Sequence, residues 1–263
     1  MDLKLQGKSV IVTGATGGIG LEIARTFSKE GALVTIPGRS QKKLDAALGD
    51  ILASGGAGVS GVLADPATEA GVEALVAAVP QIDVLVNNLG IYEAKSFQDI
   101  SDAEWRNMFE VNVMSGVRLS RAYMPGMLER NWGRIVFISS ESGLMTPGEM
   151  VHYGMTKTAQ LAVGRGLAIT ARGTGVTVNS VMPGPTRSDG IFDFLRGIST
   201  DPNATTDELE AAFFQHHRPS SLLQRLIRPE EIASLVAYVA SPLASATNGA
   251  ALRVDGGVTP TIV

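Results

Sequence analysis

The chain has 263 residues, a formal net charge of −4 at pH 7 and no cysteine. That length suits one α/β domain, which would bury roughly 70–75% of the surface of its unfolded chain. The slight acidity gives no electrostatic reason to expect nucleic acid, and the lack of cysteine excludes disulfides, thiolate nucleophiles and Cys–zinc sites. The first residues lack the apolar run of a signal peptide and no long uncharged apolar run follows, so we expect neither a signal peptide nor a membrane-spanning segment. We expect a single cytoplasmic domain over residues 1–263.

The first predicted unit is a buried strand, a glycine-rich turn and a helix. Residues 8–13 are mostly apolar and β-branched, and an amphipathic helix follows the turn as far as Gly31. Glycines let the backbone approach a ligand, and free N–H groups at a helix N-terminus favour a phosphate. We expect pyrophosphate binding here, although a tight turn needing glycine only for its geometry is the alternative. The residues expected to make these contacts are Gly14, Thr16, Gly18, Ile19 and Gly20.

Five further short apolar runs predict strands, and helical patterns separate most of them. The runs cover residues 32–36, 59–63, 83–86, 134–138 and 176–182. Helices alternating with strands are typical of a parallel sheet covered on both faces. In such sheets ligands bind beyond the carboxyl ends of the strands, so we expect the polar residues that follow these runs to form the site.

The run at 134–138 leads into the candidate catalytic stretch. It is followed by Ser140 and, after a loop, by Tyr153 and Lys157, which lie four residues apart in a helical segment. Residues four apart share a helix face, so hydroxyl, phenol and ammonium can converge. The ammonium would lower the pKa of Tyr153 and suit it to proton transfer with a substrate oxygen. Taken alone, the same pattern is also consistent with a chance helical pair and a serine that ends a strand.

Together these motifs resemble the short-chain dehydrogenase/reductase family. Thr13-Gly14-x3-Gly18-x-Gly20 is followed in the family's order by Ser140 and by Tyr153-x3-Lys157, and the similarity covers essentially the whole chain. The resemblance implies a 3-oxoacyl-reductase-like oxidoreductase whose closing strand lies near residues 252–257. The predicted fold class is therefore α/β, a doubly wound Rossmann-type three-layer sandwich with a mostly parallel seven-stranded sheet.

The resemblance implies a role for each of four catalytic residues. Tyr153 would protonate a carbonyl oxygen as hydride arrives at the carbon, and Ser140 would hydrogen-bond the same oxygen. Lys157 would hold the nicotinamide ribose, and Asn112 would sustain a proton relay to it. Without the resemblance, it is equally consistent with the sequence that Asn112 is an ordinary buried amide whose hydrogen bonds are satisfied. It lies in the predicted helix that opens with a capping box at Ser101.

The resemblance also implies where the nicotinamide cofactor lies. Asp65 and Pro66 would border the adenine, though Asp65 could equally be a cap or turn residue. NAD enzymes generally carry an acid where Gly38 stands, whereas Arg39 and Ser40 suit a 2′-phosphate, so NADP(H) is favoured and NAD(H) stays possible. The other expected cofactor contacts are Asn88, Gly90, Tyr153, Lys157, Pro183, Gly184, Thr186 and Ser188.

The segment at about 185–222 is the least regular and carries several phenylalanines. It would cover the substrate as a lid that excludes water, or it would simply pack as a helical flap on the core. Glu141 and Glu149 would border the pocket and favour a substrate with a positive group. His216 and His217 are adjacent and lack a third ligand at metal spacing, so no metal is expected.

The helix predicted near residues 151–172 has few charges and would be an exposed apolar surface unless a sister subunit covered it. A homodimer or homotetramer is therefore expected. The function predicted is hydride transfer between a nicotinamide cofactor, NADP(H) by preference, and a carbonyl or secondary alcohol. Three alternatives stay open: an inactive or regulatory cofactor-binding protein on the same fold, an isomerase or dehydratase, and an NAD(H)-dependent alcohol dehydrogenase.

Overall fold

The computed structural model of the protein describes residues 1–199 and 201–262. Within them seven strands form one sheet in the order β3-β2-β1-β4-β5-β6-β7, and every neighbouring pair is parallel. The predicted doubly wound fold is confirmed, and the sheet is parallel throughout. Its strands are β1 (Ser9–Val12), β2 (Leu33–Gly38), β3 (Val59–Leu63), β4 (Val84–Asn87), β5 (Gly133–Ile138), β6 (Val176–Pro183) and β7 (Ala251–Val254).

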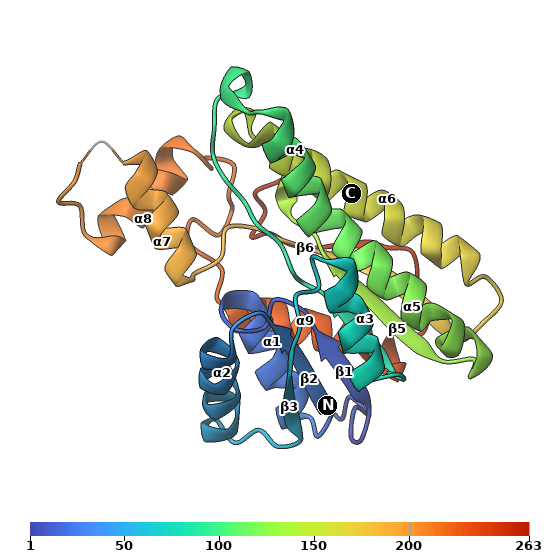
Figure 1. Ribbon diagram of the computed structural model, residues 1–263. Helices are drawn as coiled ribbons and strands as arrows, with labels where there is room; N and C mark the ends of the chain where they lie inside the picture. Colours follow the sequence, from blue (N-terminus) through green and yellow to red (C-terminus); the bar gives the residue numbers. More distant parts are fainter. Residues whose placement is uncertain (200, 263) are drawn as a thin grey trace.

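Helices cover both faces of this sheet (Figure 1). One face packs against α1, α2 and α9, and the other packs against α3, α5 and α6. The longer helices are α1 (Gly18–Lys29), α2 (Gln41–Ala53), α3 (Glu69–Ala78), α4 (Asp102–Phe109), α5 (Ser115–Glu129), α6 (Val151–Thr170), α7 (Asp189–Ile198), α8 (Thr206–His216) and α9 (Pro229–Ala240). Short helical turns are η1 (Phe97–Asp99), η2 (Glu110–Met114), η3 (Glu141–Gly143), η4 (Gly148–Met150) and η5 (Pro242–Ala244).

The apolar strands explain the three layers. Successive side chains of a strand point to opposite faces, so a strand that is apolar throughout must be covered on both sides. In β1, Val10 and Val12 join the core beneath α1 and α9, whereas Ile11 joins the core beneath α5. β5 divides in the same way, with Val136 on one side and Phe137 on the other. The hydrophobic cores thus lie on the two faces of the sheet.

The helix predicted to open at Ser101 differs from expectation in its middle. Ser101 and Glu104 do form the predicted capping box. The regular helix stops at Phe109, however, and the π-helical turn η2 separates α4 from α5. A π-turn inserts one extra residue into a helix and often marks a functional site. Here it contains Asn112, whose position in the site is described below.

α7 and α8 stand apart from the three layers, beside the carboxyl ends of the strands (Figure 1, orange). Together with Leu226, which follows them in the chain, they form a small hydrophobic cluster in which Leu195, Leu209, Phe213 and Phe214 are also buried. We call residues 185–222, which include both helices, the flap. Nowhere in residues 1–199 and 201–262 does a helix combine the length and apolarity that a membrane span requires.

Candidate active site

The turn between β1 and α1 is shaped by close backbone contacts. Gly14 and Gly18 have φ angles of +64° and +55°, a region that residues with a β-carbon rarely adopt. A β-carbon at Gly20 would overlap both the Asn88 amide and the Gly14 carbonyl oxygen. The Asn88 amide donates hydrogen bonds to the carbonyl oxygens of Thr13 (2.9 Å) and Gly14 (3.2 Å). The turn is therefore tied to the end of β4, and only glycine fits it.

The first turn of α1 leaves backbone donors free for an anion. Gly17 is its N-cap and supplies no side-chain cap. Helix N-terminal N–H groups have no partner within the helix, and the helix dipole adds a partial positive charge there. A dinucleotide pyrophosphate fits this cradle in both geometry and charge.

Beyond this turn lies a cavity of about 320 Å³ that extends along the carboxyl ends of the strands to the flap. This is where a doubly wound sheet places its ligands, at the reversal of strand order between β1 and β4. The cavity wall brings together most of the residues predicted from the sequence: Gly14, Gly18, Ile19, Gly20, Asn88, Gly90, Ser140, Tyr153, Lys157, Pro183, Gly184, Thr186 and Ser188. Six predicted residues lie outside this wall, namely Thr16, Arg39, Ser40, Asp65, Pro66 and Asn112.

Ser140, Tyr153 and Lys157 meet at the centre of this wall. Ser140 follows β5 and caps η3, while Tyr153 and Lys157 lie one turn apart on α6. The Nζ atom of Lys157 lies 5.4 Å from the centre of the Tyr153 ring and donates a 3.0 Å hydrogen bond to the carbonyl oxygen of Ile138. The structure thus brings the three side chains together as the spacing predicted.

The pKa of Tyr153 shifts in the direction opposite to the one expected from the sequence. Burial of the phenol raises its pKa above the ordinary value, and the negative charge of Glu141 adds to this rise. A hydrogen bond with Ser140 and the charge of Arg218 act the other way but do not outweigh burial. Burial also lowers the pKa of Lys157 to about 8. Tyr153 is therefore a phenol at neutral pH and a weaker acid than an ordinary tyrosine, so its proton moves only to an oxygen that gains negative charge.

Asn112 lies behind the cavity, where it fixes the backbone of residues 90–91. Its side chain accepts a hydrogen bond from the Ile91 N–H (2.7 Å) and donates to the Ile91 carbonyl oxygen (2.9 Å) and the Thr156 hydroxyl (3.0 Å). Its backbone oxygen in the π-turn accepts 2.6 Å from the Gln160 amide. A β-carbon at Gly90 would lie 3.4 Å from the Asn112 oxygen and 3.5 Å from Lys157 Nζ. Asn112 is thus a satisfied buried amide placed near the lysine.

The residues predicted around the adenosine lie on the far side of the glycine turn. Arg39 is exposed just after β2, and Ser40 occupies the N-cap position of α2 without a capping hydrogen bond from its side chain. Gly38 offers less room than the sequence suggested, because a β-carbon there would meet Leu44 at 2.9 Å and Thr16 at 3.1 Å. An acid at this position would need Leu44 to move.

Asp65 and Pro66 follow β3. Asp65 accepts a 3.1 Å hydrogen bond from the backbone N–H of Ala67, so its carboxylate forms the turn that the alternative interpretation described. Pro66 is buried. Both lie near the end of β3 and away from the wall shared by the three catalytic candidates.

The loop after β6 closes the cavity beside the flap. A β-carbon at Gly184 would meet the backbone oxygen of Asp255 at 2.6 Å, so the chain passes closely against the segment after β7. The Thr186 hydroxyl donates 2.8 Å to the Gly184 carbonyl oxygen. Ser188 accepts a hydrogen bond from Ile191 N–H at 3.2 Å and so caps α7. Thr186 and Ser188 therefore carry structural contacts in addition to their place in the wall.

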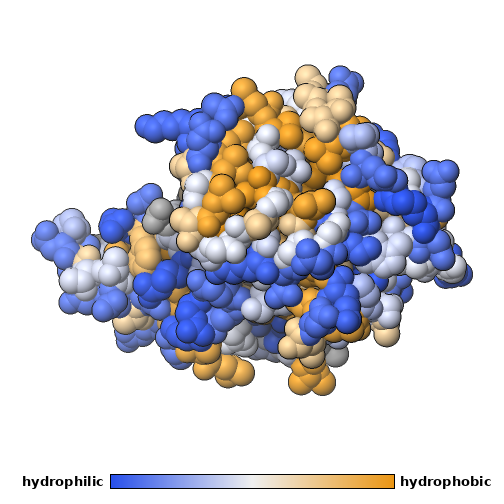
Figure 2. All heavy atoms as spheres, turned by 90° about the horizontal axis from the view of Figure 1, so that it is seen from below, coloured by the Kyte–Doolittle hydropathy of each residue, from blue (hydrophilic) through white to orange (hydrophobic). Residues whose placement is uncertain are grey.

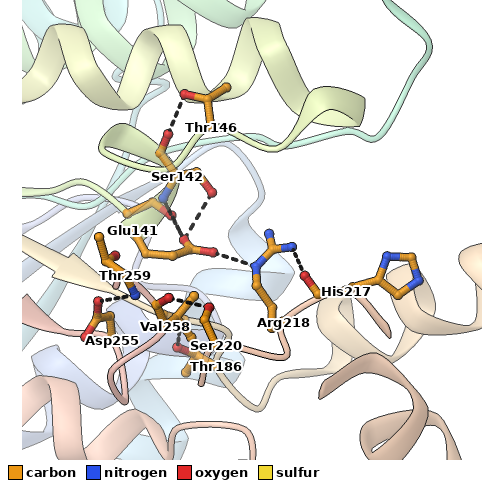
Figure 3. A network of polar contacts seen from close by, with 12 residues as sticks. Glu141, Ser142, Thr146, Thr186, His217, Arg218, Ser220, Asp255, Val258 and Thr259 are labelled. Carbon is orange, nitrogen blue, oxygen red and sulfur yellow. Dashed lines mark hydrogen bonds and ion pairs between the residues drawn. The ribbon is translucent and has the colours of Figure 1, made fainter. Parts of the chain in front are cut away.

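The expectation that Glu141 and Glu149 both border the pocket holds for Glu141 alone, and the anionic wall inferred from it is wrong. Glu149 is exposed and does not line the cavity. Glu141 does line it, but its carboxylate accepts a 3.2 Å hydrogen bond from Nε of Arg218, a buried flap residue (Figure 3). The pair has no net charge, so this wall does not favour a cationic substrate.

Sequence reasoning missed several residues of the wall. Tyr92 lies 6.2 Å from Tyr153 and 6.3 Å from Phe194 between ring centres, so three aromatic rings follow one another from α6 to the flap. Phe213 and Arg218 complete the wall on the flap side. The cluster of phenylalanines predicted a flap over the substrate, but nothing local distinguished Arg218 from the arginines that lie on the surface.

Comparison with known proteins agrees with this geometry. Residues 8–192 match the family model described as short chain dehydrogenase. The uncharacterized oxidoreductase YvaG of Bacillus subtilis (strain 168) is 49% identical over 259 residues, covering 98% of each chain. The 3-oxoacyl-[acyl-carrier-protein] reductase FabG of Escherichia coli (strain K12) is 34% identical over 257 residues, covering 97% of this chain and 99% of FabG.

A solved structure shares the whole fold. L-sorbose reductase from Gluconobacter frateurii, complexed with NADPH and L-sorbose, is 29% identical, and the alignment covers 100% of both chains with a TM-score of 0.92. The family resemblance read from the sequence is confirmed. The chain belongs to the short-chain dehydrogenase family and is an NAD(P)-dependent oxidoreductase.

Proposed function

We propose that the protein transfers a hydride reversibly between NADP(H) and a carbonyl or secondary alcohol substrate. The observation that carries this proposal is the meeting of Ser140, Tyr153 and Lys157 in one cavity that is continuous with the glycine turn of α1. A protein that only bound the cofactor would have no need for these three groups at the substrate end.

The cradle fits a dinucleotide, as the free N–H groups of α1 and the space kept by Gly20 indicate. When bound, the nicotinamide supplies or accepts the hydride. The pyrophosphate would lie at Gly14, Gly18, Ile19 and Gly20, and the nicotinamide half near Asn88, Gly90, Pro183, Gly184, Thr186 and Ser188. Lys157 would hold the ribose, because its ammonium already lies at the end of β5 facing the cavity.

Tyr153 is the proton donor in the direction of reduction. Its raised pKa keeps the proton on the phenol until a substrate oxygen gains negative charge. The Ser140 hydroxyl, which donates to Glu141 in this structure, would turn to the same substrate oxygen and stabilise that charge. Asn112 supports the relay of protons toward Lys157 by fixing the backbone beside Gly90.

We favour NADP(H) over NAD(H) because of Arg39. Its exposed guanidinium follows β2, where the adenosine ribose of a bound dinucleotide lies, and an arginine can contact a phosphate through two parallel hydrogen bonds. Ser40, Thr16, Asp65 and Pro66 would border the same half of the cofactor. The NADPH in the L-sorbose reductase structure is consistent with this preference.

The flap is proposed to cover the substrate. Phe194 and Phe213 line the cavity and also pack in the flap's own cluster with Leu209 and Phe214, which supports a flap that is both a wall of the site and a packed unit. Closing an apolar wall over the site would exclude water from the reaction.

We also propose a cytoplasmic homo-oligomer, a dimer or tetramer. The outer side of α6 exposes small or apolar residues such as Ala162, Gly166 and Ile169, the last of them 52% exposed. Figure 2 shows that side chains with hydrophobic character also gather into a broad area on the face seen from below Figure 1. Contiguous apolar surface of this kind often marks contact between protein chains.

The experiment that tests the proposed function is a screen of ketones by the absorbance of the reduced nicotinamide. NADPH and NADH are each mixed with the protein and with each ketone in turn. We expect ketone-dependent oxidation, faster with NADPH. Tight cofactor binding without oxidation across a broad panel would instead indicate the regulatory or isomerase alternatives.

A further inference from the structure

A buried ion pair links the catalytic stretch to the flap. Glu141 follows Ser140 directly, and the Ser140 hydroxyl donates a hydrogen bond to its Oε2 atom. The other carboxylate oxygen, Oε1, accepts 3.2 Å from Nε of Arg218, which follows α8 in the flap. Both side chains are more than nine-tenths buried, and both line the cavity. The pair thus lies one hydrogen bond away from the hydroxyl that is proposed to contact the reacting oxygen.

The pair keeps unused hydrogen-bonding capacity. Nη1 of Arg218 donates 2.8 Å to the His217 carbonyl oxygen and Nε donates to Glu141 (Figure 3). Its third nitrogen, Nη2, makes no hydrogen bond with any residue in the described parts of the chain. Oε1 of Glu141 accepts only the Arg218 bond there, whereas a carboxylate oxygen can accept two. A donor and an acceptor are therefore left over side by side.

The rest of the substrate end of the cavity offers little polarity. Among the described residues, three charged side chains line the cavity: Glu141, Lys157 and Arg218. Lys157 is proposed to hold the cofactor ribose. The remaining wall here is largely apolar and includes Tyr92, Met150, Ile191, Phe194 and Phe213. The ion pair is thus the charged feature of the substrate end, beside the hydroxyls of Tyr92, Ser140 and Tyr153.

The chemistry of such a pair selects what it can bind. The Nη2 donor beside a free carboxylate lone pair matches a hydroxyl group, which accepts one hydrogen bond and donates one. A carboxylate would be repelled by Glu141 and an ammonium by Arg218, because burial makes like charges costly to bring together. An apolar group would leave both charged atoms without partners.

We propose that Glu141 and Arg218 form a subsite for a neutral hydroxyl group next to the reacting carbonyl, so that the substrates are hydroxy-ketones and the corresponding diols or polyols. This inference rests on the proposed hydride transfer. In the reduction, hydride adds to the carbonyl carbon and the proton of Tyr153 goes to its oxygen. The neighbouring hydroxyl forms no new covalent bond and only orients the substrate.

The test compares two ketones of nearly equal shape. Acetoin carries a hydroxyl beside its carbonyl, and methyl isopropyl ketone carries a methyl group in the same place. The ratio of their kcat/KM values is measured with saturating NADPH. Since Tyr153 protonates both, changes in its pKa cancel in this ratio. We expect the wild type to prefer acetoin by at least about tenfold, the effect of one hydrogen bond to a charged donor.

Variants test whether Glu141 and Arg218 cause the preference for acetoin. Removing one charge alone would leave its partner buried and unpaired, so Glu141→Gln is combined with Arg218→Met. This double variant should lose at least about tenfold of the preference for acetoin while still reducing methyl isopropyl ketone. The matched control is Arg187→Met with Glu210→Gln, which removes a second ion pair of the flap that does not line the cavity. Its ratio should stay within about twofold of wild type.

Two results would overturn the subsite. The first is a wild-type enzyme whose kcat/KM values for acetoin and methyl isopropyl ketone are nearly equal. This result can be observed without any variant. The other is a double variant whose ratio is unchanged, even if both rates fall. If the wild type oxidises neither NADPH nor NADH with these two ketones or with any ketone of the broad panel, the proposed function fails instead. Calorimetric binding of the two ketones to the enzyme saturated with oxidised cofactor still decides the inference, with acetoin binding at least about tenfold more tightly if it holds.

Discussion

The ammonium of Lys157 is bound to the carbonyl oxygen of Ile138, the last residue of β5, at a distance of 3.0 Å. Only 4% of this lysine is exposed, and burial lowers its pKa to about 8. A buried cation costs folding free energy, because the unfolded chain solvates the charge fully. Lys157 is therefore a residue that the fold keeps at the expense of stability, as expected for a group that serves a ligand.

Replacing Lys157 should stabilise the cofactor-free protein. Because its pKa is lowered, the folded state favours the neutral amine, and the resulting loss of stability is fully present at pH 7, below both pKa values. At about 1.4 kcal/mol per pKa unit the cost is about 3 kcal/mol, partly offset by the bond to Ile138. We expect Lys157→Met to raise the free energy of unfolding in urea by about 1–3 kcal/mol and to abolish turnover.

The control for this stability measurement is Lys43→Met, on the exposed side of α2, which should change the free energy of unfolding by less than about 0.5 kcal/mol. A Lys157→Met variant less stable than wild type would show that the hydrogen bond to Ile138 outweighs the cost of burial.

Ser140 and Lys157 should differ in what they contribute to catalysis. Ser140→Ala removes a donor to the substrate oxygen, so it should lower kcat by about 10²–10³-fold and leave NADPH affinity within about twofold. Lys157→Ala should weaken cofactor binding as well, because the ribose contact is lost. Fluorescence titration with NADPH and steady-state rates measure both quantities. Equal losses of affinity in the two variants would contradict this division of roles.

His152 should make the protein sensitive to acid. The side chain is fully buried, both ring nitrogens lack a hydrogen-bond partner among the described residues, and burial lowers its pKa despite the opposing charges of Glu93 and Glu104. As pH falls through about 6.5, the unfolded chain takes up a proton that the folded state resists, so stability is lost. His152→Phe, which keeps a ring beside Trp105, should remove this loss.

Urea unfolding at pH 5 and pH 8 measures that effect. The fall in unfolding free energy toward acid should become shallower in His152→Phe by up to the slope of one proton, about 1.4 kcal/mol per pH unit. His216→Gln is the control, because this histidine is exposed at the end of α8. An identical pH dependence in wild type and His152→Phe would contradict the interpretation.

Arg39 should set the cofactor preference. Removing a guanidinium that pairs with a phosphate should weaken NADPH binding by about 10–100-fold and change NADH binding little. Arg39→Leu is a cleaner test than an acid at Gly38, which would meet Leu44 and Thr16. Arg106→Leu, at an exposed arginine of α4, is the control. Tighter binding of NADH than NADPH by the wild type would refute the assignment.

The parts of the fold that were predictable are those that depend on local patterns. The alternation of Val10, Ile11 and Val12 between two cores follows from an apolar strand covered on both faces. The meeting of Tyr153 and Lys157 follows from the helix repeat, and that of Ser140 with them follows from its place after β5. Each of these needs only a few neighbouring residues to specify it.

The features that were not predictable depend on contacts between distant segments. Arg218 and Glu141 are 77 residues apart, and no local pattern marks which arginine the flap will bury. The rise in the pKa of Tyr153 results from burial by surrounding parts of the chain, whereas the sequence showed only the adjacent lysine. The π-turn at Asn112 is held by the Gln160 amide and by the backbone at Ile91. Ile91 lies in a loop well before this turn in the sequence, and Gln160 lies in α6, well after it. Neither contact is therefore visible in the residues next to Asn112.

The measurement that tests the central claim most directly is the rate of NADPH oxidation by wild type and by Tyr153→Phe on a ketone that the wild type reduces. The variant keeps the ring beside Tyr92 and loses only the transferable proton. Its turnover should fall by about 10²–10⁴-fold or more while its affinity for NADPH stays within about twofold. A Tyr153→Phe variant with near-normal turnover on that ketone would show that Tyr153 is not the proton donor.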